Sequence, residues 1–139
     1  MLVYDGPSRL GKSQRAEHWF GAAETLTVNC QDVSQPNLRA WLSGVSYKAI
    51  LYDEGDWRLV WGNRKLMQAG PKGVLLAQSA CNQHAYSVLV HGVPMMLTSN
   101  GFWRGCDDDE ARDWVQTNIV YIRIAEPTWQ SAAKEASPQ

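Results

Sequence analysis

The sequence predicts an α/β domain with a mostly parallel central sheet and helices on both faces of that sheet. Short apolar runs, typical of strands buried on both faces, alternate with segments whose apolar residues recur at helical spacing. The first apolar run, residues 1–4, leads through a glycine-containing loop into a helical segment at residues 13–20. With 139 residues, 45% hydrophobic and 19% charged, the chain has the length and composition of one globular domain.

The loop after the first predicted strand fits G-x-x-x-x-G-K-[ST], the phosphate-binding loop (P-loop). Gly6 and Gly11 permit a tight turn that directs backbone N–H groups at a polyphosphate, and the following helix would hold the anion at its N-terminus. Lys12 would reach the β- and γ-phosphates, and the Ser13 hydroxyl would ligate Mg²⁺. The alternative is a chance glycine-rich turn, but the flanking strand and helix favour nucleotide binding. The residues assigned to the nucleotide are Gly6, Pro7, Ser8, Arg9, Leu10, Gly11, Lys12 and Ser13.

Composition limits the possible partners. The net charge of −1 offers no global attraction for nucleic acid, so such a surface must be local. No apolar run approaches membrane-spanning length. Cys30, Cys81 and Cys106 form no metal-binding pattern and indicate a reducing, intracellular compartment. Because the P-loop lies so near the first residue, we expect this chain to be a domain of a longer protein.

A second motif, which is acidic, ends the predicted strand at residues 47–54. A strand at 25–30 and a short helix at 36–42 are expected before it. An apolar strand that ends in Asp53 and Glu54 has the form of a Walker B element. Asp53 would hold the metal directly or through water, and Glu54 would be the general base. The alternative is a strand that ends in a solvated acidic turn. The position about 40 residues after a P-loop favours the functional interpretation.

The remaining elements complete the predicted sheet. We expect a helix at residues 57–68, a β-hairpin formed by Val74–Gln78 and Tyr86–Val90, and a strand at 93–100. Asn100 at the end of that strand would contact the γ-phosphate or orient water, or else cap the turn into Gly101. A helix at 107–115 and a last strand at 118–124 follow. The expected core is residues 1–127, with a flexible tail at 128–139.

This ordered set of motifs resembles the ATPase domain of replication initiator (Rep) proteins from small circular single-stranded DNA viruses of the geminivirus and circovirus kind. These proteins belong to the superfamily 3 helicases within the AAA+ class. The resemblance covers nearly the whole chain, and the order and spacing of the motifs are more specific than any one of them. The similar positions are 6–13, 15–16, 53–54, 65–70, 92–94, 97–100 and 114–127.

The resemblance implies a P-loop NTPase fold of AAA+ type, with the β-hairpin inserted before the strand that carries the sensor Asn100. It implies ATP and Mg²⁺ as cofactors and single-stranded DNA as partner. The full-length protein would form a homo-oligomeric ring, expected to be a hexamer, while this chain alone is expected to be largely monomeric. It would be located inside the cell, and in the host nucleus if the protein is viral.

Some family features are absent or displaced. The Lys that the family carries between Walker B and the sensor strand is missing, so Lys72, His84 or His91 would contact DNA in its place. The arginine that acts on a neighbouring subunit's site maps to Arg112, or less well to Arg104. For Arg112 the alternative is an ion pair with Asp108 or Asp109 on the surface of its own helix. Nicking by such initiators uses a His-hydrophobic-His pair, but the three histidines never stand two apart, so we expect the nuclease in an N-terminal segment outside this chain.

The sequence thus predicts ATP hydrolysis coupled to DNA unwinding, as the motor domain of a rolling-circle replication initiator. One alternative is a non-catalytic nucleotide-binding module that serves assembly or transcriptional regulation, which the missing Lys keeps open. A small P-loop kinase is a further alternative, although no Arg-rich insertion that would form its lid is present.

Overall fold

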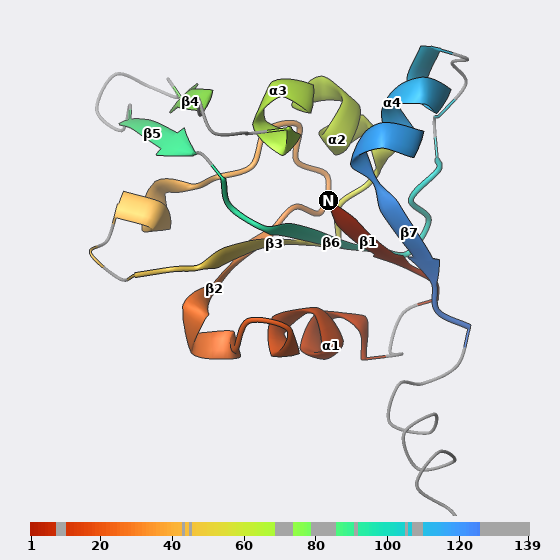
Figure 1. Ribbon diagram of the computed structural model, residues 1–139, viewed down its shortest axis with the longest axis horizontal. Helices are drawn as coiled ribbons and strands as arrows, with labels where there is room; N and C mark the ends of the chain where they lie inside the picture. The colour runs from red at the N-terminus through yellow and green to blue at the C-terminus, as the bar shows by residue number, and fades with distance from the viewer. Residues whose placement is uncertain are drawn as a thin grey trace, which may run out of the picture.

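Five parallel strands in the order β2-β3-β6-β1-β7 form the central sheet of the computed structural model (Figure 1). The structure describes residues 1–7, 11–42, 44, 46–68, 74–78, 86–90, 92–104, 106 and 110–125. The strands of this sheet are β1 (Leu2–Asp5), β2 (Thr25–Asn29), β3 (Ala49–Asp53), β6 (Met95–Ser99) and β7 (Val120–Arg123). The predicted α/β class is therefore confirmed, and the central sheet is entirely parallel.

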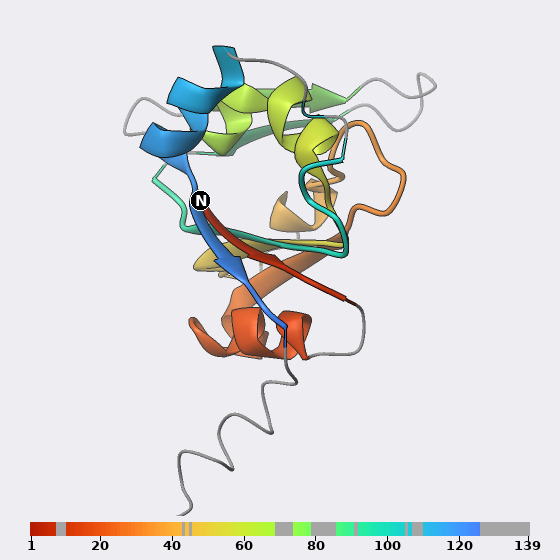
Figure 2. The ribbon, with the colours of Figure 1, turned by 90° about the vertical axis from the view of Figure 1, so that its right-hand side faces the viewer.

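Helices cover both faces of the sheet (Figures 1 and 2). α1 (Lys12–His18) and the short 3₁₀ helix η1 (Ala22–Glu24) lie on one face. α2 (Trp57–Gly62), α3 (Arg64–Met67) and α4 (Glu110–Asn118) lie on the other. This cover explains why the three inner strands are apolar almost throughout, since side chains on both faces are buried.

The core has one part on each side of the sheet. Val3, Ile50 and Leu97 point toward α2 and pack with Trp57 and Leu59 in the larger cluster. The smaller cluster lies beneath α1 and consists of Tyr4, Ala16, Ala49, Leu51, Met96 and Ile124. Alternate residues of one strand thus enter opposite clusters, as the two-residue repeat of a strand requires. This packing fixes the faces of β1, β3 and β6, and therefore the positions of the loops that follow them.

The connections that leave β1 and β6 run in opposite directions. From β1 the chain passes through α1 to β2, at one edge of the sheet. From β6 it passes through α4, on the opposite face, to β7 at the other edge. Adjacent strands whose connections diverge in this way open a crevice at their carboxyl ends, where open α/β sheets bind ligands. The carboxyl ends of β1 and β6, at Asp5 and Ser99, lie at this point of the sheet.

The antiparallel strands β4 (Val74–Gln78) and β5 (Tyr86–Val90) form a separate two-stranded sheet. Val74 pairs with Val90 and Gln78 pairs with Tyr86, as expected for the predicted hairpin. Figure 1 shows this pair beside α3, away from the central sheet. Residues 79–85 and the predicted tail at 128–139 lie outside the described residues.

Three predicted helices differ most clearly from the structure, while the other elements differ by about two residues at their ends. The expected helix at 57–68 is two helices, because at Asn63 the backbone leaves helical geometry and the Asn63 amide donates to the carbonyls of Leu59 and Ser34. The segment expected to be a short helix at 36–42 forms only the 3₁₀ helix η2 (Arg39–Leu42). The last helix, Glu110–Asn118, extends beyond the expected end at residue 115, while its expected first residues, 107–109, lie outside the described residues.

No helix among the described residues has both the length and the apolar character needed to cross a membrane.

Candidate functional site

Two glycines fix the ends of the predicted P-loop. At Gly6, directly after β1, an added Cβ would lie 2.0 Å from the carbonyl oxygen of Ile124, so no other residue fits without a backbone shift. Gly11 precedes α1 with φ of 76°, in the left-handed region that glycine adopts without steric cost. Three residues assigned to the nucleotide, Ser8, Arg9 and Leu10, lie outside the described part of the chain. The described ends have the strand-turn-helix geometry that the motif requires.

Lys12 points back into this loop. Its side chain is buried, and Nζ donates to the carbonyl oxygens of Gly6 (2.7 Å) and Pro7 (2.6 Å) and to Oδ1 of Asn100 (2.7 Å). Burial lowers the pKa of Lys12, and the nearby carboxylates, first that of Asp5, oppose this effect. The structure thus brings together the predicted lysine and the predicted sensor asparagine, which lie 88 positions apart.

A second set of hydrogen bonds joins the start of α1 to β3 and β6. Ser13 Oγ donates to Asp53 Oδ1 at 2.5 Å, and Thr98 Oγ1 donates to the same oxygen at 2.7 Å. The backbone N–H of Glu54 donates to Thr98 Oγ1 at 3.2 Å. The predicted metal residues Ser13 and Asp53 are therefore in direct contact, and Thr98 holds the carboxylate of Asp53 in place.

The Ser13–Asp53 pair fits a magnesium ion in its chemistry. Mg²⁺ takes oxygen ligands and is commonly held by one or two carboxylates together with phosphate oxygens and water. Within the described ranges, no group of three or more His, Cys, Asp or Glu residues could hold a metal ion by itself. A hydroxyl and one carboxylate would therefore supply only part of the ligands of such an ion.

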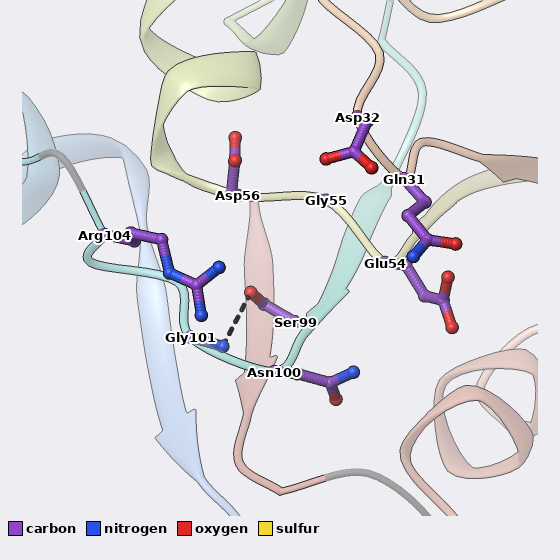
Figure 3. Close-up of a pocket in the computed structure, with 9 residues that line it drawn as sticks. All are labelled: Gln31, Asp32, Glu54, Gly55, Asp56, Ser99, Asn100, Gly101 and Arg104. Carbon is purple, nitrogen blue, oxygen red and sulfur yellow. Dashed lines mark hydrogen bonds between the residues drawn. The ribbon is translucent and has the colours of Figure 1, made fainter.

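A pocket opens beside Asn100, at the carboxyl ends of β3 and β6 (Figure 3). It is polar, and its lining comes from the segments that follow β2, β3 and β6. The lining residues are Gln31, Asp32, Glu54, Gly55, Asp56, Ser99, Asn100, Gly101 and Arg104. The predicted general base, Glu54, thus lies in one pocket with the predicted sensor residue.

Two acidic residues of this pocket have a strained backbone. Asp32 has φ of 56° and Glu54 has φ of 59°, and no other described residue except glycine has positive φ. Such a conformation costs a non-glycine residue about 1–3 kcal/mol and persists only where the surrounding structure imposes it. Asp56, by contrast, is a conventional helix cap, since its Oδ1 accepts from Leu59 N at 3.0 Å. The strain marks Asp32 and Glu54 as the unusual members of the pocket.

The two candidate arginines lie in different places. Arg104, in the loop after β6, lines the pocket, and its Nη2 would be 3.2 Å from a Cβ added to Gly101. Arg112 is exposed on α4 and is not among the residues that line the pocket. The residues expected to contact DNA, Lys72, His84 and His91, lie outside the described residues.

Asp5 was not assigned any role from the sequence. Its buried carboxylate accepts from the backbone N–H of Phe102 at 3.1 Å and from the Tyr121 hydroxyl at 2.5 Å. Burial raises the pKa of Tyr121, and the hydrogen bond to Asp5 raises it further. Asp5 therefore ties the start of the P-loop to the Arg104 loop and to β7. The only signal in the sequence was an acidic residue at the end of an apolar run.

Comparison of the chain with protein-family models found no match, and comparison with curated proteins found no significant match.

Proposed function

We propose that this chain binds ATP with Mg²⁺ and hydrolyses it. The observation that supports this most is the set of hydrogen bonds that joins Lys12 to Asn100 and Ser13 to Asp53. These four side chains come from three separate segments, the start of α1 and the carboxyl ends of β3 and β6, yet they meet where an open α/β sheet binds ligands. Phosphoryl transfer depends mainly on positioning and on charge stabilisation, which is what such an arrangement provides.

Each residue has a distinct role in this proposal. Lys12 exchanges its carbonyl partners for phosphate oxygens and neutralises their charge. Ser13 and Asp53 hold Mg²⁺, which when bound offsets the negative charge of the phosphates. Glu54 accepts the proton of the attacking water, and Asn100 orients the γ-phosphate or that water. Thr98 positions Asp53 and contacts no substrate.

The charges of the site predict that nucleotide binding depends on the metal. Among the described residues of the loop and the pocket, Lys12 and Arg104 are cationic. Asp53 and three pocket residues, Asp32, Glu54 and Asp56, are acidic. A nucleoside triphosphate adds several negative charges to this excess, and like charges at close range repel. Chelation of Mg²⁺ should therefore weaken ATP binding strongly.

The proposal extends to DNA unwinding as the motor domain of a replication initiator, on the basis of the family resemblance. The separate β4–β5 pair supports it, since the resemblance expects a hairpin before the sensor strand to contact single-stranded DNA. In the ring that the resemblance implies, Arg112 of one subunit would act on its neighbour's site. If so, Arg112→Ala subunits mixed with Lys12→Ala subunits should partly recover turnover.

A steady-state ATPase assay with and without single-stranded DNA tests this proposal. A motor domain should hydrolyse ATP and turn over faster when DNA is added. Nucleotide binding without turnover would favour the assembly module. Turnover that responds to a phosphate acceptor and not to DNA would favour a kinase. Failure to bind ATP at all, in a folded protein with Mg²⁺ present, would overturn the nucleotide assignment itself.

A further inference from the structure

We propose that Arg104 binds the terminal phosphoryl group of a nucleotide held by Lys12 of the same chain, and that it stabilises the charge of the transition state. This inference rests on the proposed ATPase function. It assigns to the chain's own site an arginine that the sequence motifs placed only as a weak candidate for action on a neighbour. The assignment follows from the loop that holds Arg104, from the environment of its guanidinium and from the charge that the reaction develops.

The loop that holds Arg104 is fixed at several points. The backbone N–H of Gly101 donates to Ser99 Oγ at 3.3 Å, and the N–H of Arg104 donates to the carbonyl of Gly101 at 3.3 Å. Between them, Phe102 is fully buried, and its N–H donates to Asp5 while its carbonyl accepts from Trp57 N at 2.9 Å. Arg104 therefore extends from a turn that is tied both to the residue before the P-loop and to the start of α2.

The side chain of Arg104 lines the pocket that also contains the sensor asparagine. It packs over Gly101, the residue that follows Asn100, and Figure 3 shows it directed toward Ser99 and Gly101. Three carboxylates line the same pocket, yet over the part of the chain that the structure describes Arg104 forms no ion pair. Within the described residues, the N–H donors of its guanidinium are therefore available to a ligand. A planar guanidinium with a fork of donors suits phosphate oxygens better than a lysine would.

The chemistry of hydrolysis would use this charge. The oxygen of water forms a bond to the γ-phosphorus, and the bond between that phosphorus and the bridging oxygen of ADP breaks. One proton of the water passes to Glu54, which later releases it to solvent, and the other stays on the new phosphate oxygen. The products are ADP and inorganic phosphate, so no other reactant is required. Negative charge on the transferred group is spread over its equatorial oxygens in the transition state. Arg104 donates hydrogen bonds to those oxygens, and its covalent bonds and protonation do not change.

The test compares the affinity for ADP with the affinity for ADP plus tetrafluoroaluminate, a planar mimic of the transferred group, in the presence of Mg²⁺. The wild-type chain should bind ADP at least about tenfold more tightly with the mimic, since sites complementary to a transition state prefer its analogues. Arg104→Ala should lose most of this gain and keep its affinity for ADP alone within about twofold. Arg104→Lys should recover only part of the gain.

Arg39→Ala is the matched control, because Arg39 is an exposed arginine in η2, before the amino end of β3 and outside the pocket. It should behave as wild type. Retention of the full gain by Arg104→Ala would overturn the inference, as would the absence of any gain in a wild-type chain that binds ADP. Failure of the wild type to bind any nucleotide would instead overturn the proposed function.

A mixing experiment tests whether Arg104 acts within its own chain. Equal amounts of Arg104→Ala and Lys12→Ala chains should show no more ATPase activity than the two variants assayed separately. Each mixed site would still lack one of the two groups, because both must come from one chain. Recovery of turnover in the mixture would show that Arg104 serves a neighbouring site, and it would overturn this assignment.

Discussion

The two sides of the candidate site are built differently. On the side next to α1, Lys12, Ser13, Asp53 and Asn100 are connected by hydrogen bonds of 2.5–2.7 Å. On the open side, in the pocket, the side chains of Glu54 and Arg104 are exposed, and Glu54 has a strained backbone. The first side would bind phosphate and metal, and the second would act on the reacting atoms.

This difference suggests that one side of the site serves to bind the ligand and the other serves to carry out the reaction. Groups that bind a ligand are more effective when they are already fixed in position, because no conformational entropy is then lost when the ligand binds. Groups that exchange protons with water must remain accessible to it. The strain at Glu54 indicates that the structure holds this residue in place at a cost in stability. Substitutions on the two sides should therefore have different consequences.

The largest effect should come from the hydrogen-bonded side. Lys12→Ala removes the cation that the loop carbonyls hold, so ATP affinity should fall and turnover should drop by at least about a thousandfold. Lys48→Ala is a suitable control, since Lys48 is exposed and pairs with Glu24 at 3.1 Å. Calorimetric titration with ATP and a phosphate-release assay measure both effects. Normal turnover in a folded Lys12→Ala chain would contradict the P-loop assignment.

A substitution on the open side should lower turnover without a comparable loss of ATP affinity. Glu54→Gln keeps the shape of the side chain but cannot accept a proton, so turnover should fall about a hundredfold while ATP affinity changes little. Glu24→Gln, an exposed glutamate far from the pocket, provides the control. If Glu54→Gln also loses ATP binding, Glu54 holds the metal or the fold, and the two sides of the site are not distinct.

The sequence predicted the hydrogen-bonded side better than the open side, for a physical reason. Lys12, Ser13, Asp53 and Asn100 lie at loop or strand ends within recognisable motifs, and parallel strands bring such ends to one edge. The contact of Thr98 with Asp53 and that of Asp5 with Tyr121 depend on which strands are neighbours. That order is set by the direction of the crossovers, which no local pattern encodes. The same holds for the meeting of Asp32 with Arg104 in one pocket.

The Asp5 carboxylate connects the start of the P-loop with the loop that holds Arg104 and with β7, and this connection can be weakened at Tyr121. Tyr121→Phe removes a hydrogen bond to the buried carboxylate of Asp5, so the free energy of unfolding should fall by about 1 kcal/mol at pH 7. The raised pKa of Tyr121 in the folded state means that the wild type loses this advantage when the hydroxyl ionises. The difference should be complete below pH 10, the ordinary pKa of tyrosine, and should shrink at higher pH. Urea denaturation at pH 7 and above pH 10 measures it, and a difference that grows with pH would contradict the contact.

A change in stability of similar size but opposite sign tests the strain on the open side directly. Glycine adopts positive φ without the steric cost that Glu54 bears, but it loses more chain entropy on folding, about 0.5–1 kcal/mol. Because the strain costs about 1–3 kcal/mol, Glu54→Gly should stabilise the fold by about 1 kcal/mol while it abolishes turnover. Gln31→Gly is the matched control: Gln31 lines the same pocket with negative φ, so only the entropic loss applies and the fold should be destabilised. Thermal and urea denaturation of both variants should therefore give shifts of opposite sign. Destabilisation of equal size in both would mean that the backbone of Glu54 is not strained, and the open side would then differ from the other only in its exposure.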